Sequence, residues 1–346
     1  MPPNRAFRGL TAPHRGWRTL GSQRQPFRGL TTPNRTSTTL GTQFCDTGGV
    51  DPAPKGVVMA DVETFDFHVT SECSQECAYC WGPQGIDAVD TETALAIIAK
   101  IASGTTRRIV FTGGDPLQRS DIGLLIRAAA EEALEVAVST TGDLVTEAFL
   151  DTSGLFIDLI SLPLDGSTEA ISARTKKPGH YAAVMEALDL LESHGDIDVK
   201  VATPVTRYNI DDVPNIAQLL NERAKRLPGR LFYNVFQAFP RSMDPDVAWD
   251  ELVVDNTSFE ELRRRVEATP HDYRINWLGH ETLDKLYVMV FPDGSLTVPS
   301  GSQFRNYGPF LEIDNLDTLL DESDFDEPKH QRHAKGWSRS QEQSPT

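Results

Sequence analysis

The chain has 346 residues, of which 39% are hydrophobic and 24% are charged, which is enough apolar material for a buried core and excludes a wholly disordered protein. Its apolar runs are far shorter than the roughly 18 residues that a membrane-spanning helix needs, and its N-terminus lacks the apolar stretch of a secretory signal, so we expect a cytoplasmic protein with no membrane partner. The net charge of −17 repels nucleic-acid backbones and excludes bulk nucleic acid as a partner.

Residues 1–58 differ in composition from the rest of the chain. They are basic, and they contain a repeat with a period of twenty, in which Phe7–Thr11 recurs as Phe27–Thr31. Because two copies cannot bury a continuous core, we expect this segment to be disordered. Met59 directly precedes the first predicted strand, so a second interpretation is that residues 1–58 lie upstream of the true start. An arginine-rich transit peptide is a third.

Strands and helices alternate from Phe65 onward. The patterns predict strands at 65–70, 108–112, 136–139, 156–162, 199–205 and 231–236, and helices at 91–103 (capped by Thr91), 120–132, near 146, 182–194 and 213–226. Apolar strands that alternate with helices indicate a parallel sheet covered by helices. Six such strands favour an α/β fold of the partial (β/α)6 TIM-type barrel class, over residues 59–245, rather than a closed eight-stranded barrel.

A C-terminal extension at residues 246–320 is predicted to cover the barrel mouth. It contains a helix at 258–268, a strand near Arg274 and a hairpin whose strands, 287–291 and 296–298, flank the turn Pro292-Asp293-Gly294. The polar tail at 321–346 is predicted to be disordered.

Three of the four cysteines lie close together, directly after the first predicted strand. The spacing Cys73-x3-Cys77-x2-Cys80 in a chain that is neither short nor secreted indicates metal binding rather than a disulfide framework. Barrels place their chemistry at the C-terminal ends of their strands, and three thiolates from one loop can hold three irons of a [4Fe–4S] cluster. The alternative is a structural zinc site with four protein ligands, for which Cys45 is the candidate fourth.

This pattern resembles the radical S-adenosylmethionine (SAM) superfamily, whose signature is three cysteines at this spacing with an aromatic residue, here Tyr79, before the last. The resemblance implies a [4Fe–4S] cluster held by Cys73, Cys77 and Cys80. It also implies SAM, bound to the fourth iron and cleaved reductively to a 5′-deoxyadenosyl radical that takes hydrogen from the substrate. The electron donor that the family implies is flavodoxin or ferredoxin.

Two loops at successive strand ends strengthen the resemblance. Gly113–Pro116 matches the family's Gly-Gly-Glu-Pro, which contacts the SAM amino group, and its glycines allow the backbone to approach a ligand closely. Ser139–Gly142 stands where the family often has Ser/Thr-Asn-Gly near the SAM ribose. Asp115 is one methylene shorter than the usual Glu, and Thr141 stands where Asn is usual.

The fourth strand supplies two more candidates. In similar enzymes a Ser on this strand and an Arg after it hold the SAM carboxylate, and an arginine fork matches a carboxylate well. The resemblance therefore assigns SAM contacts to Tyr79, Gly113, Gly114, Asp115, Pro116, Ser139, Thr140, Thr141, Ser161 and Arg174.

The substrate is not readable from the sequence, and a small molecule or a peptide is expected. The segment from Val199 to Asn209 resembles viperin-type enzymes, which dehydrate nucleoside triphosphates; Lys200 matches a lysine that faces the nucleotide there, whereas Ala202 replaces an Asn. Candidate substrate contacts are Lys176, Lys177, Lys200, Arg207 and Arg305. The resemblance thus implies a radical SAM enzyme, with a viperin-like dehydratase and a non-catalytic iron–sulfur or zinc redox sensor as alternatives.

Overall fold

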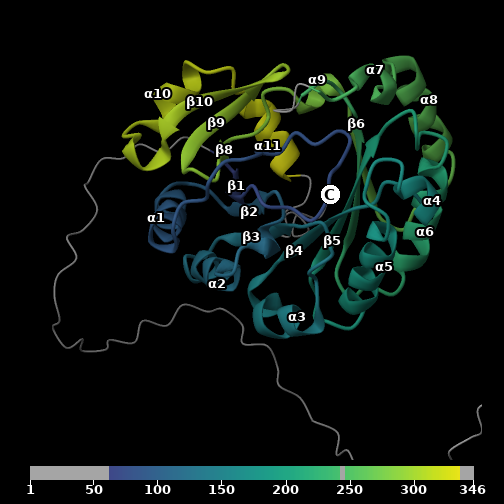
Figure 1. The fold of residues 1–346 in the computed structure, drawn as a ribbon, viewed down its shortest axis with the longest axis horizontal. Helices are drawn as coiled ribbons and strands as arrows, with labels where there is room; N and C mark the ends of the chain where they lie inside the picture. Colours follow the sequence, from purple (N-terminus) through teal and green to yellow (C-terminus); the bar gives the residue numbers. More distant parts are fainter. Residues whose placement is uncertain (1–61, 242–245, 336–346) are drawn as a thin grey trace, which may run out of the picture. The chain divides into compact units, whose positions relative to one another are not determined.

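One ten-stranded sheet in the order β10-β9-β8-β1-β2-β3-β4-β5-β6-β7 organises the described residues, which in this computed structural model are 62–241 and 246–335 (Figure 1). The strands are β1 (Thr64–Thr70), β2 (Arg108–Gly113), β3 (Glu135–Ser139), β4 (Leu159–Pro163), β5 (Asp198–Val205), β6 (Leu231–Gln237), β7 (Arg274–Leu278), β8 (Met289–Val290), β9 (Ser295–Ser300) and β10 (Gln303–Pro309). The repeat segment at residues 1–58 and Cys45 lie outside the described residues.

The predicted partial barrel with a C-terminal extension is confirmed. Neighbouring strands from β1 to β7 pair in parallel. The strand expected near Arg274 is β7, and it continues the parallel sheet beyond the six predicted strands. On the other side β8 pairs in parallel with β1, and the predicted hairpin follows as the antiparallel pair β8–β9, to which β10 adds a further antiparallel strand.

Each strand of the barrel alternates between two faces. In β1, Phe65, Phe67 and Val69 pack in the main core, whereas Asp66 and His68 line an inner cavity, because successive side chains of a strand point to opposite faces. The cavity-lining residues of β2 to β6 are Arg108, Val110, Thr112, Gly113, Ala137, Ser139, Ser161, Pro163, Lys200, Ala202, Pro204, Phe236 and Gln237. The sheet therefore has an apolar outer face and a mixed, partly charged inner face.

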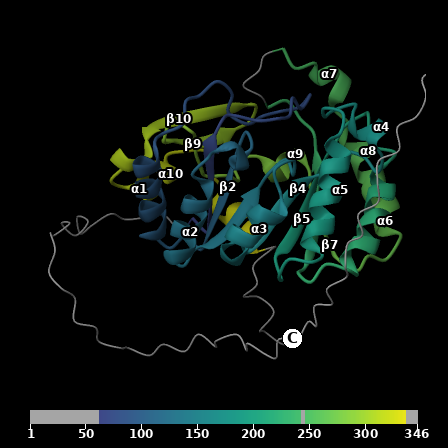
Figure 2. The ribbon, with the colours of Figure 1, turned by 60° about the horizontal axis from the view of Figure 1, so that its bottom comes forward.

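Helices cover the outer face of the sheet (Figures 1 and 2). They are α1 (Thr91–Ala102), α2 (Ile122–Glu131), α3 (Glu147–Ser153), α4 (Glu169–Ser172), α5 (His180–Leu191), α6 (Val213–Ala224) and α8 (Asn256–Glu267), with the short helices α7 (Trp249–Leu252), α9 (His280–Leu283) and α10 (Leu316–Asp321) in the C-terminal part. The predicted cap of α1 was wrong: the Asp90 side chain accepts from Thr93 N at 2.8 Å, and the Thr91 hydroxyl instead donates to Asp121 at 2.6 Å.

The expected disordered tail differs from the structure over residues 327–335, which form helix α11 (Glu327–Lys335). Its His330 is buried; Nε2 accepts from Thr64 N at 3.1 Å and Nδ1 donates to Leu286 O at 2.8 Å. His330, His333 and Ala334 line the cavity. A polar helix packs here because the inner face of the sheet is itself polar, which a reading of apolar periodicity does not anticipate. Residues 336–346 lie outside the described residues.

Candidate functional site

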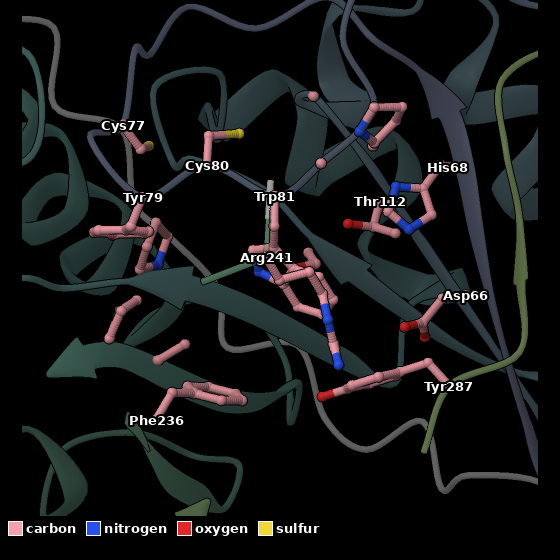
Figure 3. A pocket seen from close by; sticks show the side chains of 18 of the residues that line it. Asp66, His68, Cys77, Tyr79, Cys80, Trp81, Thr112, Phe236, Arg241 and Tyr287 are labelled. Carbon is pink, nitrogen blue, oxygen red and sulfur yellow. The ribbon is translucent and has the colours of Figure 1, made fainter. Parts of the chain in front are cut away.

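A cavity of about 980 Å³ lies within the barrel, lined by the cysteine loop after β1 and by the inner face of the sheet. Figure 3 shows Cys77 and Cys80 on one side of it, Asp66 and His68 on another, and Trp81 between them beside Arg241. Pockets for small molecules usually measure about 300–1,000 Å³. The cavity is at the upper end of this range, so it has room for two small molecules together.

Gly113 and Gly114 bring the loop after β2 against the cysteine loop. A side chain on Gly113 would lie 2.1 Å from Thr70 O, and one on Gly114 would lie 2.1 Å from Glu72 O. The Gly114 amide donates to Thr70 O at 2.8 Å. These glycines are therefore required by the close approach of two protein backbones, in addition to any ligand that their loop contacts.

Asp115 joins the loops after β2 and β3. Its carboxylate is fully buried and accepts hydrogen bonds from the Thr140 and Thr141 hydroxyls, each at 2.7 Å. Burial raises the pKa of Asp115, and the two threonine hydroxyls oppose that shift. Neither Asp115 nor Pro116, which begins a 3-10 turn, lines the cavity. These two residues, which were expected to contact SAM, thus lie outside the cavity lining, and Asp115 instead holds Thr140 and Thr141 in place at the cavity wall.

The three cysteines all line the cavity, and none of them is in a disulfide. Burial raises the pKa of the Cys73 thiol to about 11 and also raises the pKa of Cys77. Lys176 opposes the shift of Cys77, because its ammonium group donates to Cys77 Sγ at 2.9 Å. A positive charge thus lies against the thiol loop, which favours thiolates there.

Lys176, one of the candidate substrate contacts, is buried and lines the cavity. It lies 5.3 Å from the centre of the Tyr79 ring. The Tyr79 hydroxyl donates to Asp165 at 2.6 Å, and the Thr175 hydroxyl donates to the same carboxylate oxygen at 2.5 Å. Asp165 is fully buried and so ties the cysteine loop to the segment after β4.

Arg174 does not reach the cavity. Its guanidinium stacks on Tyr208 with 4.3 Å from Cζ to the ring centre, and the residue is exposed. The chain turns between Arg174 and Lys176, so that Lys176 rather than Arg174 points inward. The motif thus located a segment that reaches the cavity, but Lys176 and not Arg174 is the residue of it that lines the cavity.

Three other predicted cations also lie outside the cavity lining. Lys177 pairs with Glu76 at 2.8 Å, Arg207 donates to Val253 O at 2.9 Å, and Arg305 pairs with Asp324 at 3.2 Å. Of the five candidate substrate contacts, only Lys176 and Lys200 line it.

Ser139, Ser161 and Lys200 form a row across β3, β4 and β5. Ser139 is the register partner of Ser161, and Ser161 is the partner of Lys200. All three line the cavity. Since Thr140 and Thr141 donate their hydroxyl hydrogens to Asp115, Ser139 and Ser161 are the hydroxyls of this region best placed to contact a ligand.

Several cavity residues were missed by sequence reasoning. Asp66 and His68 come from β1, Arg108 from β2, Arg241 from the segment after β6, and Tyr287 from the segment before β8. Burial raises the pKa of Asp66 to about 7, against the lowering effect of Lys200, and burial lowers the pKa of His68 to about 3. The signal that could have found Asp66 and His68 is their alternation with Phe65, Phe67 and Val69.

The model of the Radical SAM superfamily matches residues 67–220, which contain the cysteine loop and both loops joined by Asp115. The chain belongs to the radical SAM superfamily. No helix in the described part of the chain is both long and apolar enough to cross a membrane.

The relatives of the chain within this superfamily differ in the reactions that they are named for. The chain is 23% identical over 278 residues to an S-adenosylmethionine-dependent nucleotide dehydratase of Lacinutrix mariniflava, covering 75% of this chain and 55% of that protein. It is 26% identical over 250 residues to an Fe-coproporphyrin III synthase of Methanosarcina barkeri, covering 71% and 56%. The chain thus spans about half the length of these two curated relatives.

The fold is similar to that of Streptococcus suis SuiB, whose crystal structure contains S-adenosylmethionine, with a TM-score of 0.58. The sequence identity is 11%, and the match covers 82% of this chain and 70% of that one. At this identity the likeness shows the fold alone.

Radical SAM membership implies a [4Fe–4S] cluster and SAM, and the residues present fit both. Three thiols from one loop are the ligand set of such a cluster, and Lys176 supplies a compensating positive charge. A side chain on Gly82 would lie 3.0 Å from Gly113 O and 3.8 Å from Cys80 Sγ, so a glycine there leaves space beside the thiol. Among the residues that the structure describes, no three His, Cys, Asp or Glu side chains form a site for a single metal ion.

Proposed function

We propose that this chain is a radical SAM enzyme that acts on a small molecule or peptide bound in the barrel cavity. The observation that carries the proposal is the convergence of Cys73, Cys77, Cys80 and the buried Lys176 on one cavity large enough for a cofactor and a substrate. When bound, the cluster and SAM supply a 5′-deoxyadenosyl radical, which abstracts hydrogen from the substrate. The protein binds and orients the reactants and excludes water from them.

The chain's own residues have separate roles in this proposal. The three cysteines hold the cluster, and Lys176 provides the cation that binds the SAM carboxylate in place of Arg174. Ser139 and Ser161 face the SAM ribose and carboxylate side, and the Gly113–Gly114 backbone lines the amino-group side. The Tyr79 and Thr175 hydrogen bonds to Asp165 hold the Lys176 segment against the cysteine loop.

The electron donor is proposed to be a flavodoxin or ferredoxin. Cys73 is the exposed member of the three cysteines, whereas Cys77 and Cys80 are partly buried. The outer side of the cysteine loop at Cys73 is therefore the side at which a reductant would approach.

A nucleotide dehydratase is the second candidate function. It is favoured by the relative from Lacinutrix mariniflava and by the cavity position of Lys200, which the resemblance to viperin-type enzymes assigns to the nucleotide. A triphosphate normally meets several Lys or Arg donors, and Arg207 and Arg305 are bonded elsewhere. Arg108 and Arg241 line the cavity and supply part of the positive charge that Arg207 and Arg305 do not.

The test uses the full chain, reconstituted anaerobically with iron and sulfide and reduced with dithionite. The expected result is release of 5′-deoxyadenosine and methionine from SAM, with a SAM-dependent change in the visible spectrum. Cytidine triphosphate and the other nucleoside triphosphates are then added, and acceleration of 5′-deoxyadenosine release together with loss of the nucleotide supports the dehydratase. A cluster-loaded protein that forms no 5′-deoxyadenosine, and whose spectrum SAM leaves unchanged, would instead be a redox sensor.

A further inference from the structure

Arg241 is a buried cation outside all of the family motifs. It follows β6, its side chain is 1% exposed, and it lines the cavity. Its guanidinium carbon lies 5.2 Å from the centre of the Trp81 ring and 4.7 Å from that of Phe239. A buried charge is costly unless it is paired and hydrogen-bonded, so the partners of this guanidinium decide its role.

The guanidinium is only partly satisfied within the described residues. Its Nε donates to Gly301 O at 2.9 Å, and its Nη2 donates to an Asp284 carboxylate oxygen at 3.3 Å. Its Nη1 is buried and has no hydrogen-bond partner. The contact to Asp284 uses one long hydrogen bond where a bidentate pair would use two short ones. The protein therefore fixes the guanidinium through Nε and Nη2 and leaves Nη1 without a hydrogen-bond partner.

Tyr287 contributes a second donor on the same wall of the cavity. Figure 3 shows the polar ends of Arg241 and Tyr287 on one side of the cavity, and the electrostatic interaction of the two groups also places them near each other. Burial raises the pKa of the Tyr287 hydroxyl above its ordinary value, so the hydroxyl keeps its proton and can donate. Asp66 also acts on Tyr287, and in its ionised form it would repel an anion placed deeper in the barrel.

Resting on the proposed function, we propose that Arg241 Nη1, with the Tyr287 hydroxyl, binds an oxyanion of the substrate, a carboxylate or a phosphate. A planar guanidinium held by two fixed contacts is suited to this task. Lys176, against Cys77, serves the cofactor, and Arg241, fixed by Asp284 and Gly301 of the C-terminal extension, serves the substrate. The substrate is accordingly anionic at the end that lies beside the C-terminal extension.

The experiment measures anion binding to the cluster-loaded, SAM-bound full chain by isothermal titration calorimetry. Inorganic pyrophosphate probes a phosphate source, succinate probes a carboxylate source, and succinamide is the neutral control. The variants are Arg241→Gln and Arg241→Lys, with Arg305→Gln as the matched control, since Arg305 is exposed and lies outside the cavity lining. Iron content and SAM-dependent spectral change are recorded for each variant to report an intact fold and cofactor site.

We expect pyrophosphate or succinate to bind the unmodified chain and Arg305→Gln equally, and succinamide not to bind. Arg241→Gln should weaken binding at least tenfold, the fold-change that loss of one charge-assisted hydrogen bond corresponds to, and Arg241→Lys should weaken it less. The anion that binds more tightly shows whether the site prefers a phosphate or a carboxylate. The inference is overturned if neither anion binds the unmodified chain, or if Arg241→Gln binds them as well as the unmodified chain does. It is also overturned if Arg241→Gln loses SAM binding instead, because Arg241 would then serve the cofactor.

The two proposals fail in different ways. Absence of 5′-deoxyadenosine from the unmodified chain removes the radical SAM activity whatever Arg241 binds. Formation of 5′-deoxyadenosine with unchanged anion binding in Arg241→Gln removes only the anion site. If Arg241→Gln loses its iron, the anion site is tested with Arg241→Lys alone. Anion binding at least threefold weaker in Arg241→Lys, with an intact cluster, supports the site. Unchanged anion binding in this variant overturns it.

Discussion

The two ends of the cavity are built in different ways. At the cysteine loop, neighbouring loops are tied by their backbones: Gly114 N donates to Thr70 O, and Asp115 N donates to Glu72 O at 2.7 Å. The inner wall instead combines single side chains, such as Asp66, Lys200 and Tyr287, from elements far apart in the sequence. The end at the cysteine loop is thus encoded in short contiguous segments, whereas the inner wall depends on how the whole sheet and the C-terminal extension pack.

The largest expected effect tests the cofactor end. Cys73→Ala, Cys77→Ala and Cys80→Ala should each abolish the bound [4Fe–4S] cluster and all SAM cleavage, because each removes one of only three thiolate ligands. Iron and sulfide analysis with the visible spectrum of the anaerobic protein measures this. Cys45→Ala is the matched control and should keep its cluster. Loss of iron from Cys45→Ala would mean that the site has four protein ligands.

Features that are encoded locally in the sequence could be predicted from it, whereas features that depend on contacts between distant segments could not. The alternation of apolar strands with helices predicted β1 to β6 and the barrel class, and the hairpin was visible from its Pro-Asp-Gly turn. Periodicity missed helix α11, because its buried His330 faces polar surroundings rather than an apolar core. It also gave no reason to extend the parallel sheet with β7.

For the site, motif spacing identified the cysteine loop and the two loops beside it, but it could not determine side-chain direction. Arg174 and Lys176 are two residues apart, and only Lys176 points inward, because the turn after α4 rotates the chain between them. Arg241 has no local signal at all. Its role as a cavity residue depends on contacts to Gly301 and Asp284, which are distant in the sequence.

Two departures from the family pattern contact each other. Asp115 is shorter than the usual Glu, Thr141 replaces the usual Asn, and the Thr141 hydroxyl donates to Asp115 at 2.7 Å. The shorter acid is thus matched by a hydroxyl that reaches it.

The second prediction breaks this contact. Asp115→Ala leaves the Thr140 and Thr141 hydroxyls unpaired in a buried position, so the free energy of unfolding should fall by about 2–4 kcal/mol. Urea denaturation monitored by circular dichroism measures the change. Asp87→Asn, at an exposed position, is the control and should change stability by less than about 0.5 kcal/mol. An unchanged Asp115→Ala protein would show that the two loops are held by their backbones alone.

The third prediction separates two neighbouring cations. Lys176→Met should weaken SAM binding by about 1.5–3 kcal/mol, the usual contribution of a charge-assisted hydrogen bond. Arg174→Met should leave SAM binding within about twofold, which is about 0.4 kcal/mol, because Arg174 stacks on Tyr208 outside the cavity. SAM titrations of protein with matched iron content measure both, and Lys177→Met controls for loss of a nearby surface charge. If Arg174→Met alone weakened binding, the motif would be a better guide than the side-chain geometry.

The last prediction concerns the inner wall of the cavity and how its contribution to stability depends on pH. Burial raises the pKa of Asp66 from 3.8 to about 7, although Lys200 opposes the shift. Between pH 4 and 7 the unfolded chain has lost this proton while the folded protein retains it. The folded state then binds more protons than the unfolded state, so this group makes the free energy of unfolding fall as the pH rises, by at most about 1.4 kcal/mol per pH unit.

Asp66→Asn removes the titrating group, and with it the fall in the free energy of unfolding that Asp66 causes as the pH rises. The stability of Asp66→Asn relative to the unmodified chain should therefore rise steadily from pH 4 to 7. The change at Lys200 acts in the same direction, because burial already lowers the pKa of Lys200 to about 7 and Asp66 is the group that opposes this. Without Asp66, Lys200 releases its proton at a still lower pH in the folded state, which makes stability rise with pH. Urea denaturation of both proteins at several pH values measures the difference, with Asp87→Asn as the exposed control. A difference that stays constant across this range would mean that Asp66 is ionised in the folded protein throughout. The inner wall would then carry a permanent negative charge beside Tyr287. That charge would repel an anion bound by Arg241 and Tyr287, so the anion would have to lie farther from β1.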